Sequence, residues 1–134
     1  MSQKPATRNP QPVTRAPAFD GYRLLLWLAI IGYIVLFSGL AFDLHLGMRT
    51  HKADLGQIDQ AIWNSSRGRF VESTDTGIIA SRLTDHVEPI LALVSPVLWL
   101  WNDVRALLLL QVVLVALGAW PLYELTLTLL DKSL

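Results

Sequence analysis

The stretch that decides the fold spans residues 24–42 and reads LLLWLAIIGYIVLFSGLAF. It contains no charged residue, and as a helix it would be about 28 Å long. The hydrocarbon core of a bilayer is about 30 Å thick. We therefore predict a transmembrane helix over 23–42. A cleaved signal peptide is the alternative, because Gly39-Leu40-Ala41 resembles a cleavage site, although the apolar run is longer than such peptides usually carry.

The composition of the whole chain agrees with a membrane protein. Hydrophobic residues make up 52% of 134 positions, and they gather in three blocks at 24–42, 90–101 and 106–130. The formal net charge is zero, so no overall positive field attracts nucleic acid, and we expect the bilayer as a partner instead. The chain has no cysteine, which excludes disulfides, thiol nucleophiles and cysteine-based metal sites.

Charge on either side of the first helix predicts its orientation. Residues 1–22 are rich in proline and carry more bases than acids, which predicts a disordered cytoplasmic tail. The following segment 43–88 carries seven acids against five bases: Asp43, Asp54, Asp59, Glu72, Asp75, Asp85 and Glu88 against Arg49, Lys52, Arg67, Arg69 and Arg82. We expect a multi-pass protein of the plasma membrane, with a cytoplasmic N-terminus and an extracytoplasmic loop over 43–85.

The second apolar block is too short for an ordinary crossing. Ile90–Trp101 would span about 18 Å as a helix, and Pro96 interrupts its hydrogen bonds. Trp99 and Trp101 are typical of a membrane interface. We therefore predict a juxtamembrane helix over 86–101, with a short transmembrane helix as the alternative.

The third block predicts a second transmembrane helix over 104–130, with Asp103 as its N-cap and a kink at Pro121. The expected fold class is an all-α membrane protein in which two transmembrane helices flank an external loop bearing two short juxtamembrane helices. Three transmembrane helices are the alternative.

The first of those short helices is predicted over 54–67. Its apolar residues fall on one side, Asp54 and Gln57 fit a capping box, and Gly68 fits a helix stop. Asp59 lies inside the apolar sector, where an unpaired carboxylate is costly. We expect it to face Arg67, Arg69, Arg82, His86, a metal ion or a substrate hydroxyl. A structural ion pair is one interpretation, and a general base with a raised pKa is the other.

Other candidates surround the same loop. Arg67, Arg69 and Arg82 are suited to bind phosphate, although anchoring to lipid headgroups explains them almost as well. Asp54, Asp59 and His86 could hold a divalent metal ion with Asp85 and Glu88, but their spacing matches no dedicated metal motif. The acids Asp85 and Glu88 also suit the start of the following helix. In the last helix, Glu124 and Gln111 are the notable polar residues.

Several short motifs together resemble a family of predicted multi-spanning prokaryotic membrane proteins of unknown function. They are Asp54-Leu55-Gly56-x-x-Asp59-Gln60-Ala61-x-Trp63-Asn64, Gly68-Arg69-Phe70, His86-x-x-Pro89-Ile90-Leu91, Leu109-Leu110-Gln111 and Pro121-Leu122-Tyr123. The resemblance covers about residues 24–130. That family is similar in layout to the N-terminal part of GT-C glycosyltransferases, which use polyprenyl-phosphate sugars.

The resemblance implies that Asp54, with Asp59 second, occupies the place of the catalytic acid. Arg67, Arg69 or Arg82 would bind the donor phosphate, and a divalent metal ion is a possible cofactor. Members of the family are several hundred residues long, so we expect an N-terminal piece that is inactive without further helices or a partner subunit. Two other functions fit the sequence: a small accessory subunit of a membrane complex, or a transporter fragment in which Glu124 and Gln111 line the pathway.

Overall fold

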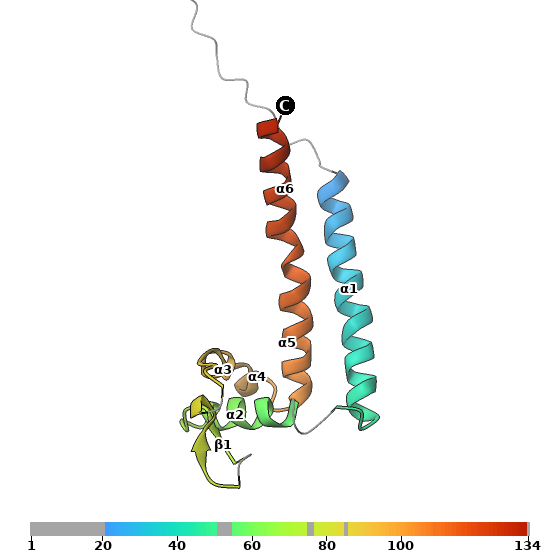
Figure 1. Cartoon of the computed structure of the whole chain (residues 1–134). Helices are drawn as coiled ribbons and strands as arrows, with labels where there is room; N and C mark the ends of the chain where they lie inside the picture. The colour runs from blue at the N-terminus through green and yellow to red at the C-terminus, as the bar shows by residue number, and fades with distance from the viewer. Residues whose placement is uncertain (1–20, 51–54, 75–76, 85, 134) are drawn as a thin grey trace, which may run out of the picture.

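Two long helices lie side by side and carry a small unit at one end (Figure 1). The computed structural model describes residues 21–50, 55–74, 77–84 and 86–133. The first long helix is α1, Gly21–Leu46, and the second consists of α5, Val104–Leu117, followed by α6, Ala119–Ser133. Both are long and apolar enough to cross a bilayer. The expected all-α membrane fold is confirmed.

The helix boundaries differ slightly from the predicted ones. Helix α1 begins two residues before the predicted start and continues to Leu46, four residues past the predicted end. The rest of the predicted cytoplasmic tail, residues 1–20, lies outside the described residues. Helix α1 ends in a turn where the Gly47 amide donates to the Asp43 carbonyl at 2.9 Å, and Met48 has φ of 55°.

The second long helix is interrupted where Pro121 predicts it. Proline has no N–H to donate to the carbonyl of Leu117, and the break between α5 and α6 falls next to it, at Gly118. The Gly118 amide is shared between the carbonyls of Leu114 and Val115, each at 3.2 Å. The two segments still follow each other as one rod (Figure 1).

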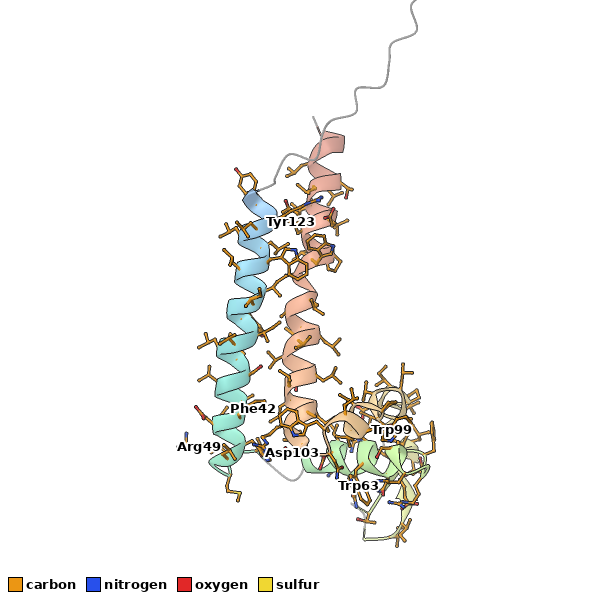
Figure 2. All side chains as sticks on the ribbon, turned by 180° about the vertical axis from the view of Figure 1, so that it is seen from behind. Phe42, Arg49, Trp63, Trp99, Asp103 and Tyr123 are labelled. Carbon is orange, nitrogen blue, oxygen red and sulfur yellow. The ribbon has the colours of Figure 1, made fainter. Side chains whose placement is uncertain are left out.

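At the end of the helix pair away from the small unit, aromatic and charged side chains join α1 to α6. The Trp27 and Trp120 rings are 5.2 Å apart, and Arg23 donates to Glu124 at 3.4 Å. Tyr123 is labelled at this end in Figure 2. Glu124, the acid in the second apolar helix, therefore pairs with the first turn of α1.

The small unit, which we call the side unit, comprises the described residues from 55 to 100. It contains α2, Gln57–Ser66; strands β1, Glu72–Ser73, and β2, Ala80–Ser81; a 3-10 turn η2, Arg82–Thr84; and helices α3, Ile90–Val94, and α4, Val97–Leu100. The strands pair antiparallel, with Glu72 opposite Ser81. No pattern in the sequence predicts this short hairpin. The core combines the side unit with the start of α5: Ala61, Ile62, Val71, Leu91, Leu98, Ala106 and Leu107.

Helix α2 is the predicted amphipathic helix, shortened at its start. Its C-terminal stop is confirmed, because Gly68 has φ of 82° and the amides of Gly68 and Arg69 donate to the carbonyls of Ser65 and Asn64. These two hydrogen bonds form the pattern that is typical of a helix ended by glycine. The predicted capping box involves Asp54, which lies outside the described residues. Among the described residues, Gly56 is the N-cap of α2 and makes no side-chain bond.

The segment predicted as one juxtamembrane helix over 86–101 is two short helices. They have five and four residues and are separated at Ser95-Pro96, where Ser95 Oγ donates to the Ala92 carbonyl at 2.8 Å. Proline cannot continue the helical hydrogen bonds. Both helices lie near α2 at the base of α5 (Figure 1). Their juxtamembrane position stays a prediction.

Candidate functional site

Helix α2 lies across the start of α5 (Figure 1). Asp59 of α2 shares a pocket with the residues that precede and begin α5. A pocket of about 130 Å³ is lined there by Asp59, Trp63, Leu98, Asn102, Asp103 and Val104. Asp103 lies at the end of the helix pair that bears the side unit (Figure 2). Two carboxylates more than forty positions apart in the sequence thus share one polar pocket.

Asp59 is half-buried, and its pKa is raised from the ordinary value of 3.8. Burial is the largest cause, the negative charge of Asp103 adds to it, and the positive charge of His45 opposes it. Within the described part of the chain, no hydrogen bond reaches the Asp59 carboxylate. A carboxylate with a raised pKa in a small pocket binds a proton more readily than an exposed one, which suits a general base.

Asp103 has the opposite environment. As predicted, it caps α5, because its Oδ1 accepts from the Arg105 amide at 2.8 Å. The Arg105 side chain adds two bonds, Nε to Oδ1 at 2.9 Å and Nη2 to Oδ2 at 2.8 Å. These bonds lower the pKa of Asp103 to about 2. Environments that separate the pKa values of two neighbouring carboxyl groups are typical of sites where one holds a proton and the other stays charged.

Two arginine side chains contact the ring of Trp63, which lines the same pocket. The guanidinium carbons of Arg67 and Arg69 lie 5.0 and 5.3 Å from its ring centroid, within the range of a cation–π contact. Arg69 also donates to Asn64 Oδ1 and lies 3.5 Å from Glu72. The Arg67 guanidinium makes no hydrogen bond or ion pair with another described residue, although the Arg67 backbone amide donates to the Asn64 carbonyl at 3.0 Å. Its exposed guanidinium can therefore bind an anion.

Arg82 is engaged inside the protein. Its side chain is buried, Nε donates to Glu88 Oε2 at 3.0 Å, and Nη1 donates to Gln57 Oε1 at 2.9 Å. These bonds join the start of α2 to the segment before α3. None of the three arginines pairs with Asp59 in the described part of the chain. The charged groups that act on Asp59 are Asp103 and His45, and neither was predicted from the sequence.

A comparison with protein families identifies the chain at this point. Residues 44–134 match the model of a family described as predicted membrane protein, DUF2079, whose function is unknown. The chain belongs to this family. The match includes the side unit, α5 and α6, and so covers every candidate site residue. No curated protein and no solved structure matches the chain.

For this member of the family, the remaining candidates are less clearly placed. Asp54 and Asp85 lie outside the described residues. His86 is exposed, and its amide donates to the Arg82 carbonyl at 2.8 Å. Among the described residues there is no group of three metal-binding side chains. Asp103, by contrast, was predicted only as a helix cap, because no local pattern shows that α2 lies across it.

Proposed function

We propose that the chain forms the acidic site of an enzyme that transfers a sugar from a polyprenyl-phosphate donor at the outer leaflet. The observation that carries this proposal is Asp59, a half-buried carboxylate with a raised pKa in a polar pocket at one end of the membrane helices. The resemblance of the sequence layout to the N-terminal part of GT-C enzymes supports it. A cytoplasmic N-terminus, as the charge pattern predicts, would place this pocket on the extracytoplasmic side.

In this mechanism Asp59 acts as the general base. It accepts the proton of an acceptor hydroxyl while the hydroxyl oxygen bonds to the anomeric carbon of the sugar. The bond between that carbon and the phosphate oxygen breaks, and polyprenyl phosphate leaves with the electron pair. Arg67 would pair with the phosphate, because its guanidinium has no acidic partner among the described residues. Asp103 stays ionised and keeps Asp59 a stronger base.

The proposal requires further helices around the substrate, from the same protein or from a partner. Large hydrophobic residues are widely exposed along both membrane helices; examples are Val35 at 69% and Leu122 at 64%. This observation also favours the second candidate function, an accessory subunit packed against a larger membrane protein. Purification in mild detergent separates the two. A stoichiometric partner with its own active site supports the subunit, and transfer activity without one supports the enzyme.

The direct test uses membranes that contain the full-length natural protein, with a radiolabelled polyprenyl-phosphate hexose as the donor probe. General bases contribute factors of about 10² to 10⁴, so Asp59→Asn should reduce release of the label at least a hundredfold. The matched control is Asp43→Asn, which removes an exposed acid near the C-terminal end of α1. This variant should release the label as fast as the wild type.

Two further variants assign the roles. Arg67→Gln should raise the donor KM with a smaller change in kcat, because the guanidinium contributes binding. Asp54→Asn distinguishes the two acids. Loss of transfer activity in Asp54→Asn alone would identify Asp54, and not Asp59, as the general base. Full activity in both aspartate variants contradicts a catalytic carboxylate on this helix.

A further inference from the structure

A second, apolar groove is lined by residues of α2 that adjoin those of the acidic pocket on the helix surface. It has a volume of about 290 Å³, comparable to the smallest ligand pockets of roughly 300 Å³. Three elements form its walls: Leu55, Ile58 and Ile62 from the α2 segment, Val94 from α3, and Leu107, Leu110, Gln111, Leu114 and Val115 from α5. Since α5 begins a helix that is long and apolar enough to cross a bilayer, a bilayer around that helix would bring lipid to this groove.

Gln111 is the polar exception in this wall. It is exposed, and its amide makes no hydrogen bond with another described residue. An amide group that faces hydrocarbon without a partner is costly, by about 4 to 8 kcal/mol on transfer from water to an alkane. The groove therefore presents a hydrogen-bond donor to whatever occupies it.

The position of Gln111 along α5 indicates what its partner is. Gln111 is seven residues past Val104, hence about 10 Å along the helix. The headgroup region of one leaflet is roughly 5 to 8 Å thick. With the start of α5 at the membrane surface, Gln111 lies just below the headgroups, close to the level of the ester carbonyls of a phospholipid.

We propose that this groove binds one acyl chain of an ester-linked phospholipid, with an ester carbonyl accepting a hydrogen bond from the Gln111 amide. A partner helix, with a diameter of about 10 to 12 Å, could cover this groove but not enter it. An isoprenoid chain fills such a space but has no carbonyl for Gln111. The lipid would secure the apolar face of α2 against α5, and this role does not depend on the proposed enzyme activity.

The test compares two lipids that differ only in that carbonyl. The full chain is reconstituted in vesicles with equal amounts of a diester phosphatidylcholine and its diether analogue, then extracted into detergent, and the retained lipid is counted by native mass spectrometry. One hydrogen bond favours the diester by about fivefold. The wild type should retain the diester with that preference, and Gln111→Leu should retain both lipids equally.

A second variant tests the groove itself. Leu110→Trp fills the groove without removing Gln111 and should reduce total lipid retention at least fivefold, whereas Val35→Trp, on the exposed face of α1, should not. Circular dichroism shows whether each variant keeps its helices. Equal retention of diester and diether by the wild type, or unchanged retention in Leu110→Trp with its helices intact, overturns the proposal. Displacement of the phospholipid by a polyprenyl phosphate at equal concentration also overturns it, because the isoprenoid would then be the preferred occupant.

Discussion

The two long helices and the side unit differ in how their apolar side chains are removed from water. Along α1 and along the second long helix, only 6% and 17% of the most apolar window is buried in protein, because the bilayer takes the place of a core. The side unit lies at one end of these helices. It buries its apolar residues among its own helices and against the start of α5. Substitutions in the side unit should therefore follow the rules of a soluble protein, and those on the helices should not.

The largest expected difference between the two regions comes from removing a buried side chain. Ile62 is 3% exposed and lies in the core of the side unit, so Ile62→Ala should lower the free energy of unfolding by about 2 to 5 kcal/mol. Val35 is 69% exposed on α1, and Val35→Ala should change it by less than about 0.5 kcal/mol. Unfolding in mixed micelles, followed by circular dichroism, measures both. Equal effects would mean that the side unit has no core of its own.

The next effect concerns the buried arginine. Arg82→Gln removes the charged bonds to Glu88 and Gln57 and should cost about 2 kcal/mol, as for hydrogen bonds to charged groups. Arg67→Gln, at an exposed site, should cost less than about 0.5 kcal/mol. Hydrogen exchange should show faster opening of α2 in the first variant alone. A stable Arg82→Gln protein with lost donor binding would instead assign Arg82 to the phosphate, as the sequence analysis allowed.

Glycine substitutions give a smaller contrast. Gly68 ends α2 with φ of 82°, which alanine adopts at a cost of about 1 kcal/mol. In α1, a Cβ at Gly39 meets nothing within 4 Å, and Gly39→Ala should be neutral or slightly stabilising because alanine favours the helix. The midpoint temperature of thermal unfolding should fall in Gly68→Ala and stay the same or rise slightly in Gly39→Ala. A neutral Gly68→Ala would show that the side unit tolerates another end for α2.

The smallest effect is expected for Asp103→Asn, at the point where the two regions meet. Asp103→Ala removes the cap of α5 and should cost about 1 kcal/mol, whereas Asp103→Asn keeps a capping oxygen. The pKa of Asp103 is lowered to about 2 from 3.8, so the folded state binds its proton more weakly than the unfolded state. The ionised group therefore contributes stability above about pH 4, and this contribution disappears as the pH falls to about 2. Asp103→Asn should lack that part of the pH dependence, as chemical unfolding at several pH values would show.

The same two regions differ in how far the sequence predicts them. The transmembrane helices, the Asp103 cap, the Gly68 stop and the interruption near Pro121 follow from local patterns, and all are present. The neighbours of Asp59 do not follow from such patterns, because they depend on how α2 lies across α5 after the loop that ends α1. The hairpin of β1 and β2 was also missed, since its two-residue strands are too short for an alternating pattern.

The central claim is that the side unit and its acidic pocket lie at one membrane surface between two crossings. The chain has no cysteine, so single cysteines can be introduced at Val87 and Asn102, on either side of α3 and α4, and labelled in intact cells with a maleimide that does not cross the membrane. The account predicts that both positions react from the extracytoplasmic side, while a cysteine at position 4 reacts only after permeabilisation. Labelling of positions 87 and 102 from opposite sides would show that α3 and α4 cross the bilayer, and would contradict the account.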